Sequence, residues 1–310
     1  MFNYIVSRLL QGVLVIFLIS VVTFIMLRLM PGDPVMLLLG EGSIQITEQQ
    51  INAIRTKWGL DKSYPEQYLV WAGNLLRGDL GESLIRRGVP VRQMIFEAMP
   101  VTGRLGLLSV AVALALAIPA GIIAAVKRNS IFDYLLTIGT TAGVALPNFW
   151  FGLMGIIIFS LYLRWLPPFG LNSWMGYILP VAVLATGEMA IFARVMRGAT
   201  IEVLSQDYVR TATAKGLAQP TVVVRHAVRN ALLPVVSVVG FRFAFLFSGT
   251  IVIETIFALP GLGRLFVDSV FRLDYQVVQS IVVVLGALVV FANLITDLVY
   301  AVVDPRLRVR

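Results

Sequence analysis

Six stretches of the chain are mostly apolar over roughly 20 residues, the length that an α-helix needs to cross the hydrocarbon core of a membrane. Such apolar runs are longer than the amphipathic helices of a soluble domain. The pattern therefore predicts an all-α polytopic membrane protein with six transmembrane helices. The predicted spans are Leu9–Leu29, Leu105–Val126, Tyr134–Leu163, Tyr177–Ala193, Ala231–Ile256 and Ser280–Val303.

The residues outside the spans form one long insert and several shorter loops. Residues 31–100 contain eight acidic and seven basic side chains, which predicts a polar insert on one side of the membrane. We therefore divide the chain into residues 1–30, which hold the amino terminus and the first helix, the insert at residues 31–100, and a core at residues 101–310. Within that core, residues 194–230 are the longest connection between two spans.

Composition supports the membrane assignment and excludes several chemistries. Hydrophobic residues make up 58% of the chain, charged residues only 14%, and the mean hydropathy is +0.86. Soluble domains carry about 25% charged residues, so a soluble protein is excluded. The chain has no cysteine, which excludes disulfides, thiolate nucleophiles and cysteine-ligated metal centres.

The distribution of basic residues predicts the orientation of the spans. If the amino terminus is cytoplasmic, twelve Lys and Arg side chains lie in cytoplasmic segments and three in the short outer loops. Short cytoplasmic loops are enriched in these residues, so we expect both termini in the cytoplasm and the insert outside. The net charge of +8 then follows from membrane topology, and no nucleic-acid partner is expected.

The long connection at residues 194–230 contains the signals of two short helices. Ser205 is placed to cap the first helix, Asp207 lies in its first turn and Lys215 in its last. Gly216 follows where a left-handed stop is expected, and Pro220 suits the first turn of a second helix at residues 221–230. We predict a helix–turn–helix pair on the cytoplasmic face.

Charged side chains inside the spans are candidates for function, because a charge at the centre of a membrane helix costs about 2.5–3.5 kcal/mol on insertion scales. Glu188 in the fourth span and Arg242 in the fifth are the best candidates for a pair that faces a cavity. Glu254 and Asp297 lie toward the ends of their spans, which favours interfacial pairing.

The third span contains a helix-breaking sequence at residues 145–150, Ala-Leu-Pro-Asn-Phe-Trp. Proline removes a backbone hydrogen bond, so a break here is expected. Asn148 and Phe149 follow the proline and are candidates for a translocation path, although a kink without such a role is the simpler interpretation. The single histidine, His226, lies between Arg225 and Arg229, which favours a structural role over metal binding.

Several sequence motifs resemble one family. The run Ala212–Leu217, with the segment Arg225–Pro234, looks like the ATPase-coupling loop of bacterial ABC importers, in particular the peptide-permease branch. At the positions where the generic loop has Glu-Ala-Ala, this chain has Arg-Thr-Ala, as that branch does. Further agreement covers nearly the whole chain, at Pro31–Pro34, Gly59–Lys62, Gly78–Gly81, Trp165–Pro168, Pro260–Arg264 and Asp304–Arg306.

The chain therefore resembles the B-type permease subunit of dipeptide, oligopeptide, glutathione and nickel importers. This resemblance implies an ABC importer type I permease fold, in which residues 194–230 are a cytoplasmic coupling loop between helices four and five. It also implies multi-pass insertion in the bacterial plasma (inner) membrane and short peptides as the substrate, with glutathione or a nickel chelate as alternatives. Residues of the loop would contact an ATPase, namely Asp207, Tyr208, Arg210, Thr211, Ala212, Lys215 and Gly216.

The partners implied by the resemblance are a second, homologous C-type permease, two cytoplasmic ABC ATPases, an extracytoplasmic substrate-binding protein and membrane lipid. The chain lacks the Gly-x-x-x-x-Gly-Lys-Ser/Thr phosphate loop, so ATP and magnesium would be bound by the ATPase subunits. No cofactor, metal or catalytic residue is expected in this chain.

Two other classes of membrane protein are weaker alternatives for this sequence. An intramembrane hydrolase needs a nucleophile and a base, but the sole histidine lies in the predicted cytoplasmic loop, so an enzyme is disfavoured. A proton-coupled secondary transporter could use Glu188, Glu254 and Asp297. That alternative leaves the structured inner loop without a purpose.

Overall fold

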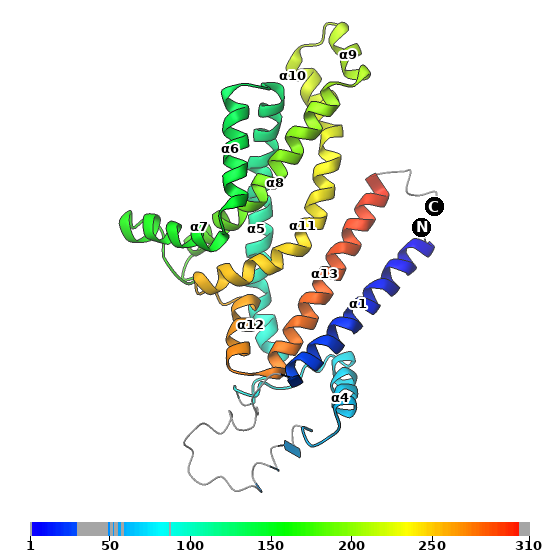
Figure 1. Cartoon of the computed structure of the whole chain (residues 1–310), viewed down its shortest axis with the longest axis vertical. Coiled ribbons are helices and arrows are strands. Elements are labelled where there is room, and N and C mark those ends of the chain that lie inside the picture. The colour runs from blue at the N-terminus through cyan, green and yellow to red at the C-terminus, as the bar shows by residue number, and fades with distance from the viewer. Residues whose placement is uncertain are drawn as a thin grey trace. The chain divides into compact units, whose positions relative to one another are not determined.

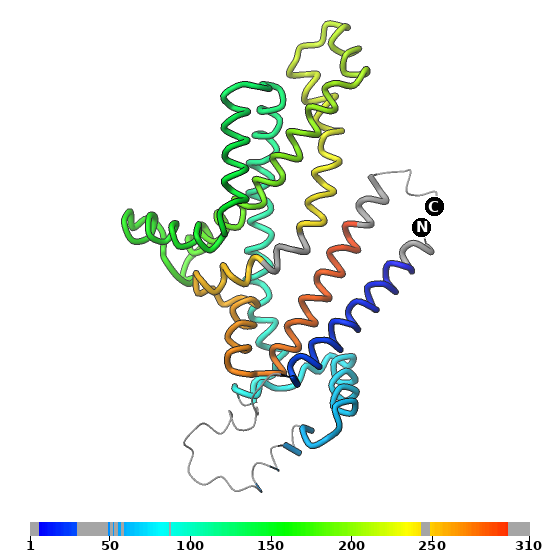
Figure 2. The backbone as a smooth tube through the Cα atoms, in the orientation of Figure 1, coloured from blue at the N-terminus to red at the C-terminus, as the bar shows by residue number. Residues whose placement is uncertain are grey.

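A computed structural model describes the backbone of residues 2–29, 49, 52, 55–56, 59–86 and 88–303 (Figures 1 and 2). Within this part of the chain, the side chains of residues 2–5, 243–248 and 297–303 are outside the description. The predicted motifs at Pro31–Pro34 and Asp304–Arg306 lie outside the described residues, as does the side chain of Asp297.

The described residues are almost entirely helical, and their only bridge of strand type joins Glu82 to Pro90. By its internal contacts the chain divides into two units. The first unit comprises Met1–Pro100 and Gly261–Val290, and the second comprises Val101–Pro260 and Phe291–Arg310.

Among its described residues, the first unit contains three complete helices and the beginnings of two longer ones. They are α1 (Phe2–Leu29), α4 (Tyr64–Leu76), α12 (Leu262–Phe271), the start of α5 (Val91–Val126) and the start of α13 (Tyr275–Val303). The core of the unit packs the first turns of α5 against α12 and α13, through a cluster that includes Val91, Ile95, Leu262, Val277 and Ile281. All five side chains are at most 2% exposed, so this cluster fixes where α13 begins.

The second unit contains the remaining helices. They are α6 (Ile131–Ala145), α7 (Asn148–Gly155), the π-helix η1 (Ile156–Tyr162), the 3₁₀ turn η2 (Trp174–Tyr177), α8 (Ile178–Leu204), α9 (Asp207–Ala214), α10 (Gln219–Thr221), the π-helix η3 (Val222–Ala227) and α11 (Val228–Ile256).

Helix α8 is the centre of the second unit, and Figure 1 shows it between α6 and α11. In its most apolar stretch 56% of the residues are buried, against 17–33% in the other long apolar helices. Its contact with α5 is close: a Cβ atom on Gly121 would lie 2.8 Å from the Ala193 carbonyl oxygen. Only glycine fits there, so α5 and α8 approach along their backbones.

The number of apolar helices agrees with the prediction. Among the described residues, five helices are long and apolar enough to cross a membrane, and the bent pair of α6 with α7 and η1 makes a sixth if it is one span. The bend between α6 and α7 is 99° and lies within the predicted helix-breaking sequence. The backbone tube in Figure 2 shows this change of direction. Leu146 is extended (φ −91°, ψ 132°) because the ring of Pro147 disfavours the helical conformation before it. The predicted all-α polytopic fold is therefore confirmed.

The start of the fifth span differs from the prediction. We expected a separate helix at residues 221–230 and a span from Ala231, but α10, η3 and α11 follow one another without interruption. Pro220 does lie in the first turn of α10, as predicted. The helix register widens to the π form at Val222–Ala227, so the chain enters α11 without a second turn.

Candidate functional site

The loop between α8 and α11 contains α9, the short helix that the sequence predicts. Helix α9 covers Asp207–Ala214, and Asp207 lies in its first turn. The expected cap at Ser205 is wrong: Gln206 is the N-cap residue, and the Ser205 hydroxyl donates to the Glu202 carbonyl oxygen at 2.7 Å. The Ser205 side chain thus bonds to the end of α8 and does not cap the first amides of α9.

One face of α9 is buried against the rest of the loop. Val209 and Ala212 are 4% and 7% exposed and form a small cluster with Val222 of η3. Tyr208 Oη accepts a hydrogen bond of 2.8 Å from Asn230 Nδ2 on α11. Of the predicted contact residues, Ala212 therefore belongs to the core of the loop, and Tyr208 connects α9 to α11.

The other face of α9 is exposed and charged. Asp207 and Arg210 lie one turn apart with 3.9 Å between their charged atoms, and their side chains are 98% and 74% exposed. An ion pair this exposed contributes about 0–1 kcal/mol, so it places little constraint on either side chain. Thr211 and Lys215 are exposed as well. The face is therefore available to a partner.

Gly216 ends this segment in the predicted left-handed conformation, with φ +81°. A Cβ atom at Gly216 would meet no atom within 4 Å. Glycine is therefore favoured here by the left-handed backbone conformation and not by lack of space for a side chain. Gly216 N donates to the Thr213 carbonyl oxygen at 2.9 Å, which closes the last turn of the helix.

The sequence suggests Glu188 and Arg242 as a candidate pair, and the structure shows that they form an ion pair between α8 and α11. Arg242 Nε donates to Glu188 Oε2 at 3.0 Å, and Arg242 Nη2 donates to Glu188 Oε1 at 2.7 Å. The Glu188 side chain is 9% exposed and the Arg242 side chain 30%. Two parallel hydrogen bonds of this kind fix both side chains in orientation as well as distance.

The other two candidates for the path lie at the start of α7. Asn148 lies beside α8, because its Oδ1 atom is 3.5 Å from the position of a Cβ atom on Gly187. Gly187 directly precedes Glu188, so Asn148 approaches the same turn of α8 as the ion pair. Phe149, the next residue of α7, is 50% exposed.

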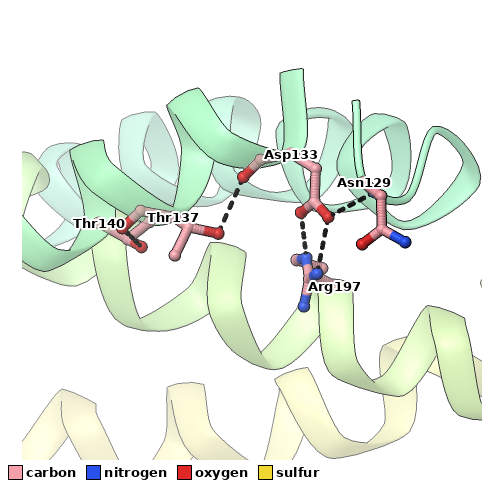
Figure 3. A network of polar contacts seen from close by, with 5 residues as sticks. All are labelled: Asn129, Asp133, Thr137, Thr140 and Arg197. Atoms are coloured by element: carbon pink, nitrogen blue, oxygen red, sulfur yellow. Dashed lines mark hydrogen bonds and ion pairs between the residues drawn. The ribbon is translucent and has the colours of Figure 1, made fainter. Parts of the chain in front are cut away.

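A second buried pair, which sequence reasoning missed, joins α6 to α8 (Figure 3). Arg197 Nε and Nη2 donate to Asp133 Oδ1 and Oδ2 at 2.5 and 2.8 Å. The Asp133 carboxylate also accepts from the backbone N–H of Asn129, at 3.0 Å. Asn129 has φ +60°, so the turn before α6 curls back onto the same carboxylate. Both residues lie just outside the predicted spans Tyr134–Leu163 and Tyr177–Ala193, so the search for charges within the spans did not include them.

Glu254 is buried in α11 and is 0% exposed. Thr102 Oγ1 on α5 donates a hydrogen bond of 2.7 Å to Glu254 Oε1. The sequence favoured pairing of Glu254 at the membrane interface. In the structure its carboxylate is instead enclosed within the second unit and bonded to a hydroxyl. Among the described residues, no group of three or more His, Asp or Glu side chains gathers as a metal site would.

The fold and these sites define a class of protein: a polytopic helical membrane protein whose central span is joined by ion pairs to its neighbours and ends in a structured loop. Comparison with known families agrees. The chain belongs to the family of binding-protein-dependent transport system inner membrane components, whose model matches residues 117–309. The model of the amino-terminal part of such membrane components matches residues 1–103.

Relatives with curated names match over nearly the full length. The oligopeptide transport system permease protein AppB of Bacillus subtilis is 40% identical, with 98% of each chain covered. The glutathione transport system permease protein GsiC of Escherichia coli is 39% identical over 99% of each chain. A putative peptide permease protein of Brucella suis is 37% identical over the whole of both chains.

These comparisons confirm the predicted class. The chain is a multi-pass inner membrane protein and a transport component, not a catalytic subunit. Membership of the family implies a substrate-binding protein and an ATPase as partners.

Proposed function

We propose that the chain is the B-type permease subunit of an ATP-driven importer of short peptides. It would pair with a homologous C-type permease, with two cytoplasmic ATPases on one side and a substrate-binding protein on the other. The peptide substrate is supported by the names of the relatives, two of which are peptide or oligopeptide permeases. In this arrangement both termini are cytoplasmic, as the distribution of Lys and Arg predicts.

The observation that carries the proposal is α9, a short helix with a buried apolar face and an exposed charged face. The apolar face packs on the loop itself, so α9 keeps its position without a partner. The exposed face, with Asp207, Arg210 and Lys215, would seat in a groove of an ATPase. Charged rims of this kind orient a partner and set the rate of encounter.

A movement of α9 would reach the membrane core through α8 and α11. Only Ser205 and Gln206 separate α8 from α9, and the Tyr208–Asn230 hydrogen bond connects α9 to α11. Helix α8 in turn is fixed to α6 by Asp133–Arg197 and to α11 by Glu188–Arg242. Because packed helices switch between discrete arrangements, closure of the two ATPases would move these helices as a connected group.

The transported molecule would pass near the Glu188–Arg242 pair. This pair and Asn148 lie where α8, α11 and the start of α7 meet. Intramembrane ion pairs are costly to bury, and such residues often mark substrate pathways. We include Phe149 in this path because it follows the same break in the helix.

The experiment is reconstitution of the purified complex in proteoliposomes, with its binding protein and a labelled dipeptide. We expect uptake that requires ATP, and ATP hydrolysis that the loaded binding protein stimulates. Arg210→Glu should abolish the stimulation while the chain remains inserted and assembled. The matched control is Arg164→Glu, outside the loop, which should leave stimulation unchanged. Uptake by this chain alone without ATP would contradict the proposal.

Glutathione is a second candidate substrate, because a relative of equal similarity is a glutathione permease. Competition resolves the two: excess unlabelled glutathione should leave dipeptide uptake unchanged if peptides are the substrate. Complete inhibition at concentrations that saturate the binding protein would show that the importer accepts glutathione as well as peptides.

A further inference from the structure

The first unit contains a pocket with a volume of about 320 Å³, lined by residues from the end of α1, from α4 and from the start of α13. This volume is within the range of small-molecule binding sites, roughly 300–1,000 Å³. The lining is rich in polar side chains, which include Arg28, Gln67, Trp71, Asn74, Gln276 and Gln279.

Three of these lining residues carry a buried polar atom with no hydrogen-bond partner in the part of the chain that the structure describes. The atoms are Trp71 Nε1, Gln276 Oε1 and Gln279 Nε2. Trp71 and Gln279 are only 8% and 2% exposed. Buried donors and acceptors are almost always paired. These three atoms have almost no accessible surface, so a group in the pocket reaches them only once the side chains turn toward it, and the pairing then removes the penalty.

The charge around the pocket favours an anion. Arg28 and Lys62 line it from the basic side, and Asp79 from the acidic side. Arg28 Nε donates to Gln67 Oε1 at 2.9 Å, and Asp79 Oδ1 accepts from the backbone N–H of Gly81 at 2.9 Å. The Asp79 carboxylate is thus bonded within its own turn, while the two basic side chains leave the described lining of the pocket with one net positive charge.

We propose that this pocket binds a small solute that carries a carboxylate with an N–H group beside it, as at the carboxyl end of a dipeptide. Trp71 Nε1 and Gln279 Nε2 donate to the carboxylate, and the Arg28 guanidinium balances its charge. Gln276 Oε1 accepts the neighbouring N–H. Each of the three unpaired atoms then has a partner of the right polarity. The pocket lies in residues that none of the predicted coupling or path sites includes.

This binding does not depend on which molecule the chain transports, so its test is a binding measurement. The full chain is purified with its co-eluting subunits in lipid nanodiscs. Saturation-transfer difference NMR then measures contact with Ala-Ala and with Ala-Ala amide, which lacks the carboxylate. We expect saturable binding of Ala-Ala and at least about tenfold weaker binding of the amide, since hydrogen bonds to charged groups are the stronger ones.

The variant Trp71→Phe removes the indole N–H and keeps an aromatic ring against Phe24 and Tyr68, whose ring centroids lie 6.5 and 6.0 Å from that of Trp71. We expect it to bind Ala-Ala about tenfold more weakly. Trp174→Phe is the matched control, because Trp174 is 71% exposed and does not line the pocket. It should bind as the unmodified chain does.

Gln279→Met provides a second variant, of similar volume, if Trp71→Phe fails to assemble. It should also lose affinity about tenfold. Equal binding of Ala-Ala and its amide would overturn the proposal, because the carboxylate would then contribute nothing to binding. Unmodified affinity in both pocket variants, or no saturable binding to the unmodified chain, would overturn it too.

Discussion

Arg242 of α11 donates two hydrogen bonds to Glu188 of α8, although 54 residues separate them in the sequence. Both side chains belong to apolar helices, and the Glu188 side chain is 9% exposed. Each charge compensates the other within a region where an isolated charge is costly. The pair therefore ties together the two helices that lead into and out of the loop that contains α9.

Replacing only Glu188 should destabilise the protein strongly. Glu188→Leu leaves the Arg242 guanidinium without its carboxylate, and removal of one partner of a buried pair costs about 3–5 kcal/mol. Thermal unfolding of the complex in nanodiscs should show a clear loss of stability. The double variant Glu188→Leu with Arg242→Met should recover most of it, because no uncompensated charge remains. A double variant as unstable as Glu188→Leu would argue against the pair as the cause.

Transport should be more sensitive than stability to Glu188→Gln. The amide keeps the volume and one acceptor atom but loses the charge, so much of the structure is expected to persist. If the pair lies on the translocation path, dipeptide uptake per folded complex falls severalfold. Glu202→Gln, an exposed position near the end of α8, is the control and should transport normally. Normal uptake by Glu188→Gln would restrict the pair to a structural role.

The Asp133–Arg197 pair should connect the α5–α6 turn to the loop. Asp133→Ala removes the acceptor of three hydrogen bonds and should cost about 3–5 kcal/mol. A double-mutant cycle with Arg197→Ala isolates the interaction, and we expect a coupling energy of about 0.5–3 kcal/mol. The measurement is thermal unfolding, followed by ATPase stimulation in each variant that assembles. Additive effects of the two substitutions would mean that the pair contributes nothing of its own.

The features predicted from the sequence are those with a local physical cause. The helix breaks at Pro147 because proline has no backbone N–H to donate. Gly216 adopts a left-handed conformation because glycine has no side chain to oppose it. The long apolar helices can also be predicted from short segments of sequence. Polar backbone groups in lipid must be hydrogen-bonded within their own segment, so a long apolar run becomes a helix.

The features that the sequence did not reveal depend on tertiary structure. Asp133 and Arg197 are 64 residues apart, and their pairing requires α6 to pack on α8. Ser205 has the composition of a helix cap, but its hydroxyl bonds to the carbonyl oxygen of Glu202. The π-helical turn at Val222–Ala227 has no residue signature, and it joins the loop to α11 where a separate helix was expected.

Tyr208→Phe tests the contact between α9 and α11. The substitution keeps the ring and removes only the hydroxyl that accepts from Asn230 Nδ2. A partly exposed hydrogen bond of this kind contributes about 0.5–1.5 kcal/mol, so the complex should assemble and remain stable. Stimulation of ATP hydrolysis by the loaded binding protein should fall, because α9 is less firmly held to α11. Tyr134→Phe, at another exposed tyrosine, should have no effect on stimulation.

Gly216→Ala tests whether the geometry at the end of α9 matters for coupling. At φ +81° an alanine is strained by about 1–2 kcal/mol, even though its Cβ atom would meet no neighbour. The last turn should therefore loosen, and ATPase stimulation should fall while basal hydrolysis persists. Gly139→Ala is the matched control: it adds the same methyl group inside α6, also with nothing within 4 Å, and it favours the helix. If Gly216→Ala and Gly139→Ala are stimulated equally, the left-handed stop has no part in coupling.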